Sequence, residues 1–277
     1  MAKTNHVELL PDIINQGFSE AEMPDAYAHM GLELHRAGNA AGAKNCADQA
    51  KFLANRTPAL QVLYEVAGVT LKPEEKPYSV PPAGLLSYFN RMYGATLNAV
   101  NKDTNAALAV AIRGGPDQAD DKLRALAAVA DWAENATEAA TKADAVLTNE
   151  GKGKSNAGYA LLRLATAAGK AGQADLADKL IAAIADDGLK AWAKAEAIRA
   201  KLDMIKDQKA ELSLVDQTTD KGKVRVGHVW VAVLVARHNA AATGDQSAAK
   251  VYADWPDGAF KGAGLAGLAV GIQDRKK

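Results

Sequence analysis

The chain has 277 residues, which is enough for one large domain or for an extended array of small repeats. Its 33 basic and 33 acidic residues cancel, and this removes the simplest electrostatic reason to expect nucleic acid or an acidic membrane as a partner. The single cysteine, Cys46, excludes an intramolecular disulfide framework.

The amino-terminal sequence MAKTNHVELLPDII lacks a basic start followed by a long apolar run, so we expect no secretory signal. No stretch approaches the ~18 to 20 apolar residues that a membrane span needs. The simplest expectation is a cytoplasmic protein, or a periplasmic or secreted one if a signal peptide has been removed.

Residues 24–58 have the periodicity of a helical hairpin. Apolar and small residues recur at helical spacing in both halves, so each half presents one face for burial. Cys46 falls on the second face, which favours a packed thiol over a reactive one. The positions are Tyr27, Met30, Gly31 and Leu34, followed by Ala43, Cys46, Ala47 and Ala50.

Residues 72–82, KPEEKPYSVPP, contain four prolines and must interrupt any helix. We predict an extended linker or a long loop there, and it is the best candidate boundary. It would separate an N-terminal helical segment with the first hairpin, residues 1–71, from a helical-repeat array, residues 83–277. Residues 85–100 are predicted to be a helix, and they include the most aromatic spot in the chain, at Tyr88, Phe89, Met92 and Tyr93.

Pairs of small residues recur along the chain at one internal distance of twelve residues. Small residues at fixed positions allow neighbouring helices to approach to ~8 Å. Ala127 and Ala165 are 38 residues apart, and Ala165 and Ala236 are 71 residues apart. These distances are close to one and two units of about 35 residues, a period typical of helical solenoids. The pairs are Gly31 and Ala43, Ala127 and Ala139, Ala165 and Ala177, and Ala236 and Ala248.

The hairpin at residues 24–58 resembles the tetratricopeptide repeat family. Tyr27, Met30, Gly31, Leu34, Ala43, Ala47, Ala50 and Pro58 fill positions of the family pattern, although Ala47 stands where an aromatic residue is usual. Residues 158–190 match the pattern less strictly, and about two thirds of the chain shows it. The resemblance implies an all-α fold, a right-handed α-solenoid of antiparallel helical hairpins with a period of about 35 residues.

The same resemblance implies that the first helix of each hairpin lines a concave groove. Basic and polar side chains along that groove could hold an acidic or carboxylate-ended peptide, and a solvated helix face is the alternative interpretation. Asp131, Thr166 and His238 fall at related positions. The candidate partner-binding residues are His35, Arg36, Arg124, Trp132, Lys170 and Arg237.

No pattern in the chain indicates catalysis, and we predict no catalytic residue, no metal site and no cofactor. The GKS at residues 153–155 lacks the glycine that a phosphate-binding loop needs at Thr148. The paired histidines do not share a helix face, and no G-x-S-x-G sequence is present.

Two classes of function stay open. The first is a non-catalytic interaction or assembly scaffold that binds a protein or peptide in its concave groove. The alternative is an all-helical enzyme or small-ligand receptor with a pocket near residues 88–93. The C-terminal sequence GAGLAGLAVGI is too apolar for an exposed end of an array, so we expect it to pack on another copy, another domain or back on this chain.

Overall fold

The computed structural model describes residues 10–53, 56–150, 155–201 and 259–275, together with Val233, Ala236, Arg237 and Ala240. This part of the chain contains helices and irregular segments but no strand, and its isolated bridge joins Ser155 and Ile184. The predicted all-α class is confirmed for these residues.

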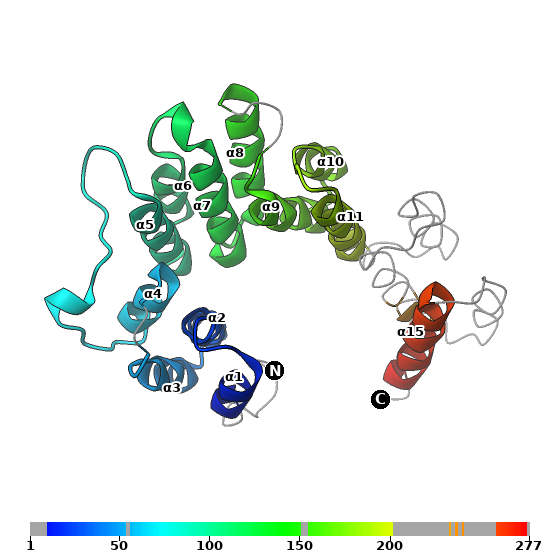
Figure 1. Cartoon of the computed structure of the whole chain (residues 1–277), viewed down its shortest axis with the longest axis horizontal. Helices are drawn as coiled ribbons and strands as arrows, with labels where there is room; N and C mark the ends of the chain where they lie inside the picture. Colours follow the sequence, from blue (N-terminus) through cyan, green and yellow to red (C-terminus); the bar gives the residue numbers. More distant parts are fainter. Residues whose placement is uncertain are drawn as a thin grey trace. The chain divides into compact units, whose positions relative to one another are not determined.

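The chain forms two compact units, Met1–Asn135 and Ala136–Lys277, here called unit 1 and unit 2. The helices of both units are labelled in Figure 1. Residues 72–82 lie inside unit 1. The helices predicted around Ala127 and Ala139 are both present, but they belong to different units.

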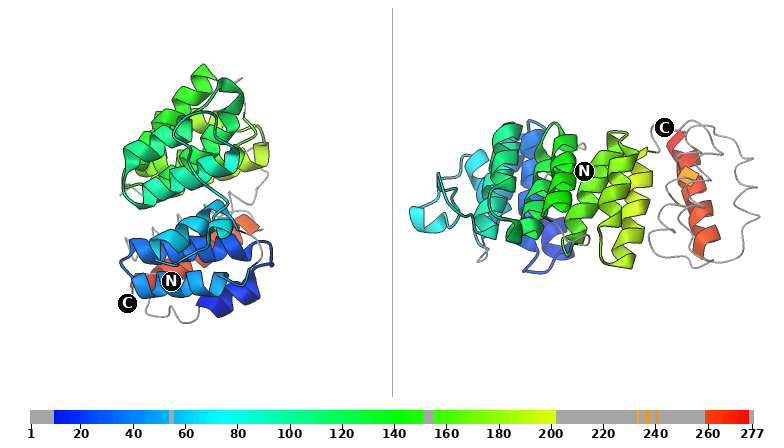
Figure 2. Two further views of the ribbon diagram at one scale, coloured as in Figure 1. Left: turned by 90° about the vertical axis from the view of Figure 1, so that its left-hand side faces the viewer. Right: turned by 90° about the horizontal axis from the view of Figure 1, so that it is seen from above.

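Unit 1 is built from helices that pack in succession (Figure 2). Helix α2 packs on α3 and α4, α4 packs on α5, and α5 packs on both α6 and α7. The helices are α1 (Leu10–Gly17), α2 (Met23–Arg36), α3 (Ala40–Ala50), α4 (Pro58–Val66), α5 (Tyr88–Val100), α6 (Thr104–Ile112) and α7 (Ala119–Trp132), with 3-10 turns η2 (Pro73–Glu75) and η3 (Pro116–Gln118).

The spacing of these helices is uneven. Helices α2, α4, α5 and α7 begin at residues 23, 58, 88 and 119, so the intervals are 35, 30 and 31 residues. A constant period of about 35 residues is therefore not confirmed. Helix α2 is followed by a second helix, α3, whereas α4 is followed by residues 67–87, which contain the η2 turn and otherwise no helix.

Local chemistry explains where the first hairpin turns. Gly38 has φ +78°, a left-handed conformation that glycine adopts without steric cost, and it ends α2. The side chain of Asn39 then accepts the backbone N–H of Gly42 at 2.8 Å and caps the start of α3. The three residues 37–39 are too few for anything but a tight turn between two packed helices.

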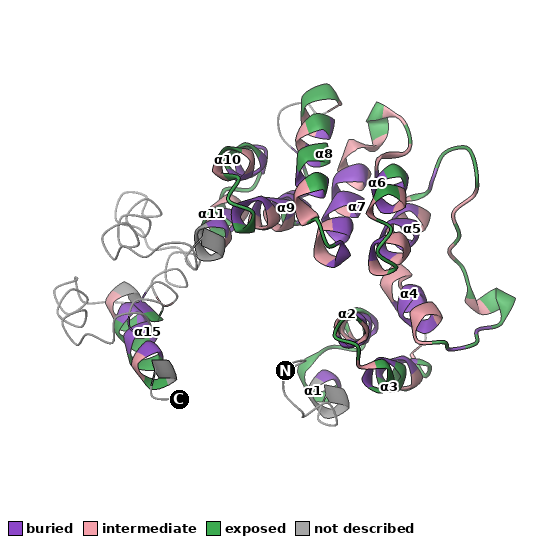
Figure 3. Ribbon diagram, turned by 180° about the vertical axis from the view of Figure 1, so that it is seen from behind, coloured by how far each residue is buried: buried purple, intermediate pink, exposed green. Residues whose placement is uncertain are grey.

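The predicted small residues that the structure describes, all but Ala248, are buried. Buried and exposed stretches alternate along the helices of unit 1 (Figure 3). A Cβ on Gly31 would lie 2.6 Å from both methyl carbons of Leu63, so any side chain at this position would have to displace the buried Leu63 side chain of α4. Ala43 of α3 and Ala127 of α7 are fully buried, and Cys46 is 1% exposed. Burial raises the pKa of the Cys46 thiol to about 11, as expected for a packed rather than a reactive thiol.

Unit 2 is centred on helix α9, which packs on α8, α10 and α11. Ala165 of α9 and Ala177 of α10 are fully buried, and Gly172 between these helices has φ +75°, a left-handed conformation that suits the end of α9. The described helices of this unit are α8 (Ala136–Asn149), α9 (Gly158–Lys170), α10 (Ala174–Ala182), α11 (Asp187–Lys201) and α15 (Ala259–Arg275).

The C-terminal helix α15 packs back on this chain through two glycines. A Cβ on Gly267 would lie 2.1 Å from the carbonyl oxygen of Val233, and one on Gly271 would lie 2.2 Å from that of Arg237. Ala236 and Ala240 are fully buried. The approach of backbone to backbone explains the glycines at positions 267 and 271. Ala248 and His238, which also entered the repeat and groove predictions, lie outside the described residues.

Candidate functional site

Three of the predicted groove residues lie together in unit 1, where the ends of α2 and α7 meet. The Arg36 guanidinium donates to the backbone carbonyl of Asp131 over 3.2 Å. The ring of Trp132 is 5.3 Å from the ring of His29, and Trp132 is only 9% exposed. Trp132 therefore packs within unit 1, while Arg36 remains at the surface.

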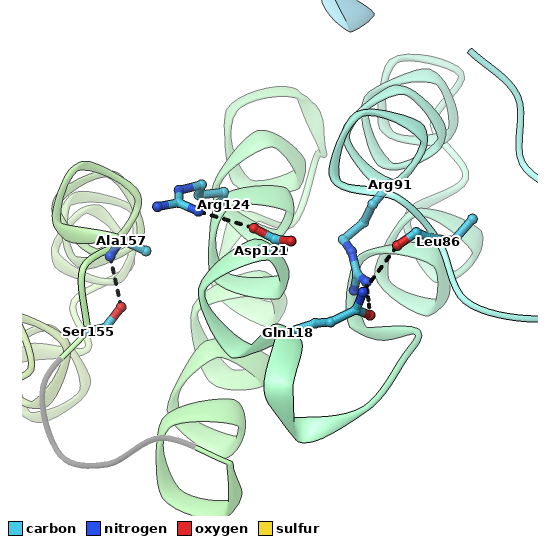
Figure 4. Close-up of polar contacts among 7 residues, drawn as sticks. All are labelled: Leu86, Arg91, Gln118, Asp121, Arg124, Ser155 and Ala157. Carbon is cyan, nitrogen blue, oxygen red and sulfur yellow. Dashed lines mark hydrogen bonds and ion pairs between the residues drawn. The ribbon is translucent and has the colours of Figure 1, made fainter.

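Arg124 joins two features that the sequence suggested separately. Its guanidinium pairs with Asp121 one turn earlier in α7, at 3.1 Å (Figure 4). Its Cζ also lies 5.9 Å from the centre of the Tyr88 ring at the start of α5, within the range of a cation–π contact. A predicted groove cation thus lies beside the predicted aromatic segment.

The remaining candidates do not join this group. His35 is half-buried on α2, and Lys170 is exposed at the end of α9 in unit 2. Arg237 is exposed in unit 2 as well. The six predicted partner-binding residues are thus divided between the two units, with His35, Arg36, Arg124 and Trp132 in unit 1.

Apolar and aromatic side chains at and near the start of α5 are exposed or half-buried, and we call Tyr78, Leu85, Tyr88 and Phe89 the aromatic surface. Leu85 is 74% exposed and Phe89 is 52% exposed. The Phe89 ring is 5.9 Å from that of Tyr78 and 5.1 Å from that of Tyr88, so stacking holds it in place. A fixed, exposed aromatic side chain is a feature of interaction sites.

Residues 76–81, which we call the strap, run alongside this surface in an irregular conformation. Gln61 of α4 is 1% exposed, and its side-chain amide bonds both backbone groups of Tyr78: the Tyr78 N–H donates to Oε1 at 3.0 Å, and Nε2 donates to the Tyr78 carbonyl at 2.9 Å. Arg113 donates to the carbonyl of Pro81 at 2.7 Å. The proline-rich segment is thus docked on the helices by hydrogen bonds.

A buried polar cluster supports α4 and α5 beneath the strap. The Tyr93 hydroxyl donates to the carboxylate of Glu65, with oxygen separations of 2.9 and 3.0 Å, and Gln61 also donates to Glu65. Burial, and secondarily the hydrogen bond to Glu65, raises the pKa of Tyr93 to about 12. Tyr93 therefore stays protonated and serves as a donor.

Arg91 of α5 is completely buried and closes the end of α6. It donates to the carbonyls of Ala111 at 3.2 Å and Arg113 at 2.5 Å, and to the Gln118 side chain at 2.6 Å. The Gln118 amide in turn donates to the carbonyl of Leu86 (Figure 4). All of these partners are neutral acceptors at a helix end or in a loop, so Arg91 serves as a helix cap.

Unit 2 has a pocket of about 400 Å³ at the beginnings of α9 and α11. Tyr159, 68% exposed, lines this pocket and stacks edge-on against Trp192, with ring centres 6.3 Å apart. Asp186 also lines it, but one carboxylate oxygen accepts the backbone N–H of Leu189 at 2.6 Å and caps α11. The pocket offers an aromatic wall and small polar groups.

Within the described part of the chain, no three His, Cys, Asp or Glu side chains gather closely enough to hold a metal ion. Of the helices that the structure describes, none is both long enough and apolar enough to cross a membrane.

Comparisons with known proteins do not assign the chain to a family: no protein-family model matches, and no match was found among curated proteins or among solved structures. The resemblance to tetratricopeptide repeats therefore stays a prediction, and any function must be argued from the residues themselves.

Sequence reasoning had found the aromatic segment but had missed the residues that organise it. Leu85 was expected inside a helix over residues 85–100, but α5 begins only at Tyr88, so Leu85 lies in the irregular segment before it. Gln61 is a polar residue of α4 that no sequence pattern marked, and it is buried. Tyr159 was also missed. It stands two residues before Leu161 in a predicted helix, so helical spacing places it away from the apolar face and it gives no periodic signal.

Proposed function

We propose that this chain is a non-catalytic interaction or assembly scaffold that binds a polypeptide partner. The observation that carries the proposal is the aromatic surface of unit 1. Large apolar side chains at 74% and 52% exposure lose hydrophobic stabilisation in water, and their burial by a partner would recover it. Phe89 is already ordered by two neighbouring rings, so binding would cost it little conformational entropy.

The succession of packed helices supports the finer part of the proposal, a right-handed α-solenoid of hairpins related to tetratricopeptide repeats. In such an array each first helix packs on its own second helix and on the next first helix, as α2 and α5 do. The uneven intervals mean that the units would differ in length. Arg124, whose guanidinium lies over the Tyr88 ring, would then supply positive charge beside the aromatic surface for an acidic stretch of the partner, and Arg36 would supply positive charge at the end of α2.

The test compares capture of proteins from an extract of the source organism by matched variants. Leu85→Ser and Phe89→Ser remove apolar area from the aromatic surface, whereas Phe52→Ser removes an equally large exposed side chain elsewhere, at 90% exposure. We expect a partner that the parent and the Phe52 variant retain and that the other two lose. Equal capture by all four proteins, or no specific capture at all, would contradict the proposal.

A charge-reversed variant tests the groove residues separately. Arg36, Arg124 and Lys170 are changed to glutamate together, and the variant must keep the far-UV spectrum of the parent. Loss of the same partner would extend its contact to these cations, and unchanged capture would confine it to the aromatic surface. A cytoplasmic location and self-association through α15 also stay predictions.

The pocket of unit 2 favours one second candidate, a small-ligand receptor. Pockets of this size that offer an aromatic wall and a few polar groups are suited to small molecules. A thermal-shift screen against a metabolite library would test it, with Tyr159→Ala as the control. A compound that stabilises the parent but not this variant would support the second candidate.

A further inference from the structure

The strap is held in the way that an extended peptide ligand would be held. Its hydrogen bonds run from backbone atoms to side chains of the helices: Gln61 bonds both groups of Tyr78, Asn90 accepts the Ser79 N–H at 3.3 Å, and Arg113 binds the Pro81 carbonyl. Backbone recognition of this kind does not depend on the side chains of the bound segment. Proteins that bind extended peptides obtain their affinity from such bonds.

Selectivity comes from two side-chain positions. Val80 sits in a notch on α5, because a Cβ on Gly94 would lie 2.3 Å from Cγ2 of Val80 and 3.0 Å from Cγ1 of Val110. Tyr78 lies against Phe89, and its hydroxyl donates to the carbonyl of Arg56 at 2.6 Å. The helices thus accept an aromatic residue followed two positions later by a residue of the size of valine.

We propose that α4, α5 and the residues just after α6 form a peptide groove, that the strap occupies this groove in cis, and that a partner's extended segment replaces the strap. The partner segment would carry the same pattern, an aromatic residue, any residue, then a β-branched aliphatic residue. This inference rests on the proposed function and names the chemistry of its partner.

Because the strap is covalently attached to the chain, it competes with a free peptide for the groove. A tethered segment acts at an effective concentration on the order of millimolar, so a short free peptide competes poorly with it. The partner gains a second contact if it also covers Phe89, which is 52% exposed and whose ring lies 5.9 Å from that of Tyr78. The apparent affinity for a free peptide is proportional to the fraction of grooves that are vacant, so release of the strap should raise it by the ratio of the vacant fractions after and before release.

The experiment measures binding of a fluorescein-labelled synthetic peptide, KPYSVPP, to the full chain by fluorescence anisotropy. Val80→Asp places a carboxylate in the apolar notch and should expel the strap while leaving the groove unchanged. We expect this variant to bind the peptide ~10-fold or more tightly than the parent does. Adding Gln61→Ala to it should reverse the gain, and a peptide with aspartate in place of the valine should not bind.

Two results would overturn the inference. One is a Val80→Asp variant that keeps the helicity and the cooperative unfolding of the parent but binds no peptide. The other concerns a Val80→Asp variant that no longer unfolds cooperatively. If the milder Val80→Ala and Tyr78→Ala variants then also bind no peptide, the strap is an integral part of the core. Tightening by several-fold in either milder variant supports the inference if the aspartate variant does not fold.

Failure of this inference can be told apart from failure of the proposed function. If the peptide does not bind but a partner is still captured through Leu85 and Phe89, the groove is wrong and the scaffold stands. If neither the peptide nor a partner binds, both are wrong.

Discussion

At the scale of single residues, Gly31 sets the distance between α2 and α4. We expect Gly31→Val to lower the free energy of unfolding by ~1 to 3 kcal/mol, because the added carbons would overlap Leu63 and crowd the Cβ of Cys46, 3.1 Å from the position of the new Cβ. Urea unfolding of parent and variant measures this loss. Gly17→Val is the control, since no heavy atom lies within 4 Å of a Cβ there, and a similar loss in both variants would contradict the packing argument.

The buried thiol of Cys46 predicts a specific dependence on pH. Burial raises its pKa from 9.0 to about 11, so between these values the unfolded chain loses the thiol proton and the folded chain keeps it. The folded state then binds more protons, and stability falls as the pH rises through this window. We expect the parent to lose stability relative to Cys46→Ala between pH 9 and 11, with a constant difference below pH 8. Urea unfolding of both proteins across this range would measure it, and a constant difference throughout would show that the thiol ionises equally in both states.

At the scale of elements, the close approach of α15 to the backbone of Val233 and Arg237 depends on two glycines. We expect Gly271→Ala to weaken this contact, because the new methyl group would meet a carbonyl oxygen that belongs to the backbone and cannot rotate away. Gly262→Ala in the same helix is the control, since its Cβ meets nothing within 4 Å and alanine favours helix by ~1 kcal/mol. Hydrogen exchange of the α15 amides measures the effect of each variant. We expect protection to fall in Gly271→Ala and not in Gly262→Ala, and a rise in protection in both variants would contradict the contact.

Elements also differ in how far the sequence predicted them. The hairpin of α2 and α3 follows from periodicity and from the turn at Gly38, both of which are local properties. The strap could be predicted only as a break in helix, because its hydrogen bonds come from Gln61 and Arg113, which are distant in sequence. Arg91 gave no signal at all: a charged residue is expected at the surface, and only the end of α6 makes its burial favourable.

At the scale of the whole molecule, the sequence suggested one repeating array with a break at the prolines, and the structure divides after Asn135. Pro73, Pro77, Pro81 and Pro82 signal an interruption of helix, but an interruption is compatible with either a linker or a docked segment. The choice between these two depends on tertiary contacts. The aromatic surface was visible in the sequence as composition, and its exposure became visible only in the structure.

Two compact units, each with its own buried alanines, should unfold separately. Trp132 reports on unit 1 if the other three tryptophans are replaced by phenylalanine, and Trp132→Phe leaves only tryptophans of unit 2. In both backgrounds Ala165→Leu overpacks a fully buried position of α9, which should cost ~1 to 3 kcal/mol. We expect the urea midpoint reported by unit 2 to fall while that reported by Trp132 stays constant. Gly31→Val, in unit 1, should lower the urea midpoint reported by Trp132 and leave the midpoint reported by unit 2 constant. Equal shifts of both reporters would mean that the chain unfolds as one cooperative body, and binding at the aromatic surface would then stabilise both units equally.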